Sequence, residues 1–232
     1  RGGRSSFRHS LQERGVDRIQ PLRGGGGDMG AHTLDAAYYS LDLKVPLSVR
    51  ADVETPAKPW SLPSGGIITW EFAARGDMPP VTLRYHLGTA NTKSLPRPKH
   101  LEAERAFKQS SLSIIIGEKA SIMSGSHSQS AMIIPEVVRR EVGRASGNSY
   151  RNEGKGHFQN FTLACKGTGT AMSNFEYAGP LSEIIVLGDI ALMHPNKTLK
   201  WDSVGMKITN DEAANNSLFM RRLDPRDNMG WC

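Results

Sequence analysis

The stretch GPLSEIIVLGDIALMH, residues 179–194, decides the fold class. Its apolar residues recur at the i, i+3, i+4 and i+7 spacing that lines one face of an α-helix. The residues that share this face are Leu181, Ile184, Ile185, Gly188, Ala191 and Leu192. Pro180 suits the first turn of a helix, and Pro195 ends one. The stretch therefore predicts a helix that belongs to the hydrophobic core.

Strand patterns come before this helix. Apolar and charged side chains alternate over residues 48–54, which is the period of a half-buried strand. IITWEFA at 67–73 and VTLRYHL at 81–87 predict two more strands. SLSIII at 111–116 and ASIMSG at 120–125 flank a short turn and predict a hairpin. Strands early in the chain and helices late predict an α+β fold with a mostly antiparallel sheet.

The remaining elements follow from local signals. A helix is predicted over 32–43, ended by Pro46, and irregular structure over 135–156. A second helix is predicted over 157–165, with Phe158, Phe161 and Ala164 or Cys165 on one face. A strand is predicted over 198–202, followed by a helix from a capping box at 209–212 to about Arg222.

Composition excludes several classes of protein. With 38% hydrophobic and 22% charged residues in 232, the chain has the composition of a globular domain. It has no run of about 18 to 20 apolar residues, so we expect no membrane span. Its two cysteines and seven histidines show no metal-ligand spacing, so we expect no metal site.

The positive charge is concentrated at the start of the sequence. Residues 1–23 hold six arginines against Glu13 and Asp17, a net charge of +4 out of +6 for the chain. This segment reads as a basic leader or linker without regular structure. One RGG without interleaved aromatic residues is too little to indicate nucleic-acid binding, so we expect no nucleic-acid partner.

The stretch GGGGDMGAHTLD, residues 24–35, contains the candidate catalytic pair. If a helix begins near Asp28, then Asp28 and His32 share one face, one turn apart. An imidazole beside a carboxylate can transfer a proton near neutral pH. The same residues also suit an ordinary N-cap after a glycine-rich turn, and spacing alone does not separate the two. The glycine run lacks the G-x-G-x-x-G pattern and the preceding strand of a dinucleotide site.

Five segments, in this order, resemble the glucose–fructose oxidoreductase / inositol dehydrogenase (Gfo/Idh/MocA) family. They lie at residues 24–35, 72–85, 114–125, 173–192 and 199–216, and the resemblance covers about 24–222. It implies that residues 24–232 form the family's C-terminal substrate domain, an α+β domain with an open, mainly antiparallel sheet and helices on one face. The cofactor implied is NAD or NADP. The Rossmann half that binds it, with its catalytic Lys, has no counterpart here.

The resemblance also implies roles for residues. His32 is the expected acid/base on a substrate hydroxyl, and Asp28 its support. Tyr85, Asn174 and Tyr177 are candidate substrate contacts. The alternative for Asn174 and Tyr177 is capping and packing before Pro180, and the alternative for Tyr85 is a half-buried sheet position.

Three functions remain open. The first is the substrate domain of an NAD(P)-dependent oxidoreductase acting on a sugar, cyclitol or polyol. The second is an NAD-dependent glycoside hydrolase of the same fold, and the third is a non-catalytic fragment that assembles with partners. We expect a homo-oligomer formed through the sheet face. Related proteins exported by the twin-arginine route leave the compartment open between cytoplasm and periplasm.

Overall fold

A computed structural model of the chain describes residues 26–54, 62–63, 65–87, 97–107, 112–125, 127, 130–143 and 156–216. They form two compact units. The first unit takes its described residues from 26–28, 45–91 and 185–232, and the second from 29–44 and 92–184. The predicted leader at 1–23 lies outside the described residues, and a single domain over 24–232 stays a prediction.

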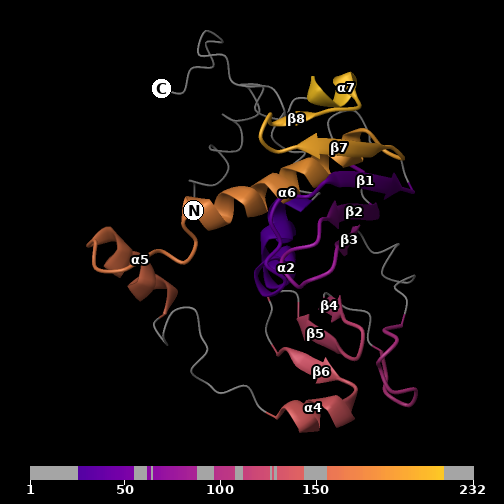
Figure 1. Ribbon diagram of the computed structural model, residues 1–232, viewed down its shortest axis with the longest axis vertical. Coiled ribbons are helices and arrows are strands. Elements are labelled where there is room, and N and C mark those ends of the chain that lie inside the picture. The colour runs from indigo at the N-terminus through magenta and orange to yellow at the C-terminus, as the bar shows by residue number, and fades with distance from the viewer. Residues whose placement is uncertain are drawn as a thin grey trace, which may run out of the picture. The chain divides into compact units, whose positions relative to one another are not determined.

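A five-stranded antiparallel sheet forms the base of the first unit, in the order β3-β2-β1-β7-β8 (Figure 1). Its strands are β1 (Ser48–Val53), β2 (Gly66–Phe72), β3 (Val81–Leu87), β7 (Thr198–Asp202) and β8 (Lys207–Ile208). Val49 lies opposite both Trp70 and Leu199, so the three side chains share one face of the sheet. All three are buried, and the predicted alternation along β1 is confirmed.

Helix α6 (Phe175–Met193) covers the buried face of this sheet with its C-terminal half. Leu187, Ile190 and Leu192 are at most 1% exposed, which confirms the predicted core helix. Gly188 is the point of closest approach. A Cβ atom added there would lie 2.6 Å from Cζ2 of Trp70, so only glycine fits without displacing the indole.

The opposite face of the sheet is polar. Arg50 pairs with Asp52 along β1, at 2.6 Å, and Thr82 donates a hydrogen bond to Glu71 across the β2–β3 pair. Both pairs are exposed to solvent, so each contributes little to stability. The homo-oligomer predicted through a sheet face stays a prediction.

The second unit combines helix α2 with a three-stranded antiparallel sheet. Its elements are α2 (Gly26–Ser40, from Met29 on), β4 (Leu112–Ile116), β5 (Ser121–Gly125), β6 (Met132–Ile134), α4 (Glu136–Val142), α5 (His157–Cys165) and the start of α6. Figure 1 shows β4, β5 and β6 side by side, with α4 next to β6. The predicted hairpin at 111–125 is confirmed. The general class is therefore α+β with antiparallel sheets, although the strands form two sheets instead of one.

Several predicted boundaries were wrong for local physical reasons. The segment 135–156 was predicted to be irregular, but α4 forms there because Glu136 pairs with Arg139 and Arg140 one turn later. Helix α6 begins at Phe175, so Pro180 lies inside the helix and not in its first turn.

Helix α2 begins at Gly26, earlier than predicted, and ends before Pro46 is reached. The Asp42 amide donates to Tyr39 O and the Leu43 amide to Tyr38 O, with Asp42 in the left-handed region at φ 45°. This is a Schellman C-cap, formed here on aspartate where glycine is usual.

Two further findings concern the remaining helices. Helix α7 (Glu212–Asn215) is capped by Asp211, whose carboxylate accepts from the Ala214 amide, and the predicted Thr209 cap was wrong. Helix α5 has its predicted bounds, but none of its residues is buried, and Phe158 is 88% exposed. Of the described helices, none is long and apolar enough to cross a membrane.

The closeness of α6 to Trp70 leads to the first prediction. Gly188→Ala should lower the free energy of unfolding by about 1–3 kcal/mol, because overpacking outweighs the better helix propensity of alanine. Urea unfolding followed by tryptophan fluorescence measures this change. Trp70→Leu completes a double-mutant cycle with this change. Gly188→Ala should lower the free energy of unfolding by less when residue 70 is leucine. Strictly additive effects of the two changes would contradict the contact.

Candidate functional site

Helix α2 positions His32, the candidate acid/base. The helix contains both Asp28 and His32, so the backbone places them one turn apart, as predicted. The side chain of Asp28 lies outside the described residues, and its predicted contact with His32 stays a prediction. The His32 side chain is exposed, so its ring is accessible to a ligand.

A second imidazole lies against His32. The rings of His32 and His127 have centroids 4.8 Å apart and planes tilted by 36°. His127 lies between β5 and β6 and is also exposed. The sequence does not predict this pair, because no local spacing signals a contact between residues so far apart in the chain. Only the pairing of β5 with β6 after the hairpin brings the two rings together.

Hydrogen bonds hold this arrangement on both sides. Ser113 Oγ of β4 donates to the Thr33 carbonyl of α2, at 3.0 Å, and thereby ties the hairpin to the residue after His32. Met123 pairs with Met132 across β5 and β6, which closes the connection that carries His127. Both ends of this connection are therefore fixed by regular structure.

Tyr177, in the first turn of α6, contacts α2 about one turn beyond His32. Its hydroxyl donates to Oδ1 of Asp35, and its ring packs edge-on against Tyr38, with centroids 5.3 Å apart. Tyr39 adds a second edge contact, at 6.4 Å. The candidate substrate contact Tyr177 therefore joins the first turn of α6 to α2.

Asn174 caps α6. Its Oδ1 accepts from the Tyr177 amide at 3.0 Å, and its Nδ2 donates to the Ala171 carbonyl at 3.1 Å. These contacts agree with the capping alternative for Asn174. Tyr85 lies on β3 in the first unit, half-buried and opposite Ile68, on the face that forms the core. Substrate contact by these two residues stays a prediction.

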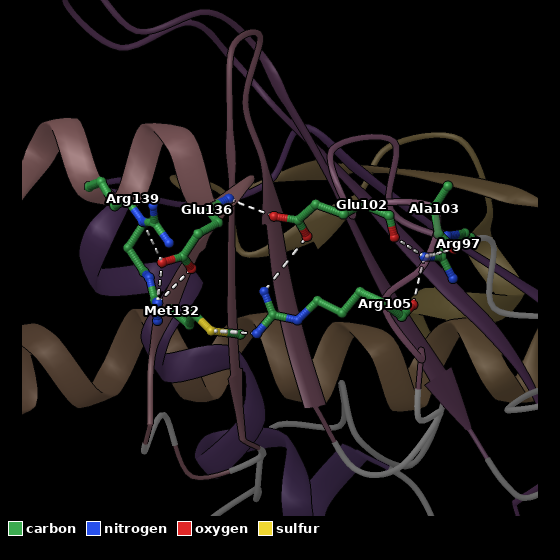
Figure 2. A network of polar contacts seen from close by, with 8 residues as sticks. Arg97, Glu102, Ala103, Arg105, Met132, Glu136 and Arg139 are labelled. Carbon is green, nitrogen blue, oxygen red and sulfur yellow. Dashed lines mark hydrogen bonds and ion pairs between the residues drawn. The ribbon is translucent and has the colours of Figure 1, made fainter.

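A network of charged side chains anchors segment 97–107 to β6 and α4 (Figure 2). Glu102 Oε1 accepts from the Glu136 amide at 2.6 Å, and Arg105 reaches Met132 Sδ at 3.1 Å. Arg97 donates to the carbonyls of Glu102, Ala103 and Arg105. The network holds the start of α4 and the strand that follows His127.

His100 adds a second anchor from the same segment. Its Nδ1 lies 2.7 Å from Oγ of the buried Ser121 on β5, and its Nε2 lies 3.2 Å from the Glu118 carbonyl. Segment 97–107 therefore contacts both strands that flank the connection carrying His127. The Glu118-Lys119 turn is part of this anchor.

The network shifts the acidity of its carboxyl groups. The Glu136 amide, which donates to Glu102, is the main cause that lowers the pKa of Glu102, and the Arg105 charge adds to it. The hydrogen bond from Arg139 lowers the pKa of Glu136. In the first unit, burial lowers the pKa of His86, and the Arg84 charge lowers it further.

The described part of the chain holds no cluster of three or more His, Cys, Asp or Glu side chains placed to bind a metal ion. His32 and His127 form a pair with no third ligand of this kind among the described residues.

Comparison of the chain with protein-family models and with curated proteins finds no match.

The Tyr177 contacts lead to the second prediction. Tyr177→Phe should lower the free energy of unfolding by about 1–3 kcal/mol, because Asp35 loses a charge-assisted hydrogen bond while the aromatic packing stays. Chemical denaturation of Tyr177→Phe, Asp35→Asn and the double variant measures the coupling. If the changes in the free energy of unfolding of the two single variants sum to that of the double variant, the hydrogen bond contributes nothing to stability.

The lowered carboxyl pKa values lead to the third prediction. A carboxyl with a lowered folded-state pKa contributes stability above its unfolded pKa, near 4.5, and loses it as the pH falls through the folded pKa. Glu102→Gln keeps an acceptor for the Glu136 amide but cannot titrate. Its free energy of unfolding should therefore fall less than that of the wild type between about pH 5 and pH 3. The exposed neighbour Glu104→Gln is the control, and an unchanged slope in Glu102→Gln would contradict the prediction.

Proposed function

We propose that this chain is the substrate domain of an NAD(P)-dependent oxidoreductase of the Gfo/Idh/MocA type, acting on a hydroxyl of a sugar, cyclitol or polyol. The observation that carries the proposal is the accessible imidazole of His32 on α2, in contact with a second imidazole. Oxidation of a secondary alcohol needs a base at the hydroxyl, and histidine is the side chain best suited to this near neutral pH.

The chain's own part of the reaction is proton transfer. A ring nitrogen of His32 accepts the proton of the substrate hydroxyl as hydride leaves the same carbon, and it returns a proton in the reverse direction. Asp28, one turn earlier in α2, is the proposed support for this role. Histidine in this role contributes about 10²–10⁴-fold to a rate.

The described residues do not fit a dinucleotide. Their strand pairs are all antiparallel, whereas a dinucleotide site of the Rossmann type needs a parallel βαβ unit. We therefore assign NAD or NADP, which would accept the hydride, to a separate Rossmann domain. The α+β class with open antiparallel sheets supports the role of substrate domain in general terms.

The fourth prediction tests His32 directly. Titration of the ¹³C-histidine-labelled chain with myo-inositol and with glucose should shift the His32 ring resonance saturably, with half-saturation at about 1 mM or below. The shift should disappear in His32→Ala. His157→Ala, which changes an exposed histidine at the start of α5, is the matched control and should leave the binding unchanged.

In an assembly that supplies a dinucleotide-binding domain, His32→Ala should also lower kcat by about 10²–10⁴-fold. Binding of these polyols without any change at His32, or full turnover by His32→Ala, would overturn the proposal.

A further inference from the structure

We propose that Asp35 of α2 is a second ligand-binding residue. Its carboxylate accepts a hydrogen bond from one substrate hydroxyl while His32 acts on another, so that the site takes neutral polyols and excludes anionic sugars. The inference rests on the proposed function of His32 and adds a binding residue and a substrate class to it. It starts from the hydrogen bond that the Tyr177 hydroxyl donates to Oδ1 of Asp35.

Asp35 lies beside His32 on the surface of α2. The two residues are three positions apart in one helix, so their Cβ atoms are neighbours at about 5–6 Å. The buried side chains of this helix, Leu34, Ala37 and Tyr38, lie on the side opposite His32. His32 is exposed and Asp35 is half-buried. A ligand bound at His32 therefore lies next to the Asp35 carboxyl group.

One oxygen of this carboxyl group is open to a ligand. Oδ1 accepts from Tyr177, whereas Oδ2 of Asp35 has no hydrogen-bond or ion-pair partner in the part of the chain that the structure describes. Oδ2 is not one of the buried atoms that lack a partner, so solvent reaches it. A carboxylate only accepts hydrogen bonds, and each of its oxygens has room for about two. Oδ2 is therefore placed to accept from a ligand hydroxyl.

The position of the carboxylate is set before any ligand binds. The Tyr177 amide donates to Oδ1 of Asn174 at 3.0 Å, and the Tyr177 ring packs edge-on against Tyr38, with centroids 5.3 Å apart. Tyr38 is 6% exposed, so the ring that orients the Tyr177 hydroxyl is itself held in the core. A group held in this way loses little conformational freedom on binding, which favours a gain in affinity from each hydrogen bond.

The charge of Asp35 determines the class of ligand. A hydroxyl donates a hydrogen bond to a carboxylate, whereas a sugar carboxylate has no proton to donate and carries the same charge. None of the ion pairs between described residues neutralises Asp35. A charge on a sugar ring bound at His32 lies within about 8–10 Å of Asp35, the distance over which salt leaves charges unscreened. Neutral polyols are therefore favoured over sugar acids.

The alternative is that Asp35 only anchors Tyr177. Two variants separate the roles, because both change the same internal hydrogen bond. Tyr177→Phe removes the bond and keeps the carboxylate. Asp35→Asn removes the charge, but its amide oxygen still accepts from Tyr177. Asp42→Asn is the matched control, since it removes a carboxylate roughly 10 Å further along the chain of α2, and asparagine tolerates the left-handed conformation found there.

The experiment measures the affinity of the purified chain for glucose and for glucuronate at pH 7, read from the His32 ring resonance. These probes differ only in the group at carbon 6, which is a hydroxymethyl group in one and a carboxylate in the other. We expect the wild type to bind glucose about 3- to 10-fold more tightly, as repulsion between two partly exposed charges allows. Tyr177→Phe and Asp42→Asn should keep this preference, and Asp35→Asn should remove it.

The outcomes separate this inference from the proposed function. Loss of the preference in Asp35→Asn, with the preference kept in Tyr177→Phe, supports the inference. A preference that persists in Asp35→Asn, that is lost equally in Tyr177→Phe, or that is absent from the wild type while glucose still shifts His32 overturns the inference alone. The wild-type comparison tests the inference even where a variant does not fold. If neither glucose nor myo-inositol shifts His32, the proposed function is wrong, and the role of Asp35 falls with it.

Discussion

The burial of α6 is the constraint on which both cores depend. Leu181 and Ile184, which belong to the second unit, and Ile190 and Leu192, which belong to the first, are all buried. A helix with apolar residues around most of its circumference is stable only when several surfaces cover it. Gly188 is required because α6 meets an indole ring at that turn, and a side chain there would separate the helix from its sheet.

The imidazole pair follows from a different constraint, the register of short antiparallel strands. A one-residue slip between β5 and β6 would move every side chain of β6 to the other face of the sheet and change where the connection ends. Two strands of five and three residues fix a register weakly when they are alone. The bonds from Glu102, Arg105 and His100 supply the additional restraint.

The sequence predicted those parts of the structure that local periodicity determines. Strand β3 has the predicted bounds because apolar and polar residues alternate throughout it, and Trp70 is buried because its strand alternates in the same way. Periodicity describes an element but not what covers it, so the apolar face of α5 was predicted correctly while its exposure was not. The sequence did not predict the helix C-cap at Asp42, because the left-handed backbone conformation found there is usually adopted by glycine.

The candidate site, like the fold, could be predicted only where local spacing determines it. The helical spacing of Asp28 and His32 could be predicted because both belong to one helix, whereas the contact with His127 depends on strand pairing far along the chain. Polar residues at a helix start are poor site candidates for a physical reason. Asn174 already bonds the Tyr177 amide and the Ala171 carbonyl, and the Tyr177 hydroxyl bonds Asp35, so a ligand would have to replace those hydrogen bonds. His32, by contrast, is exposed on α2, so a ligand can reach its ring.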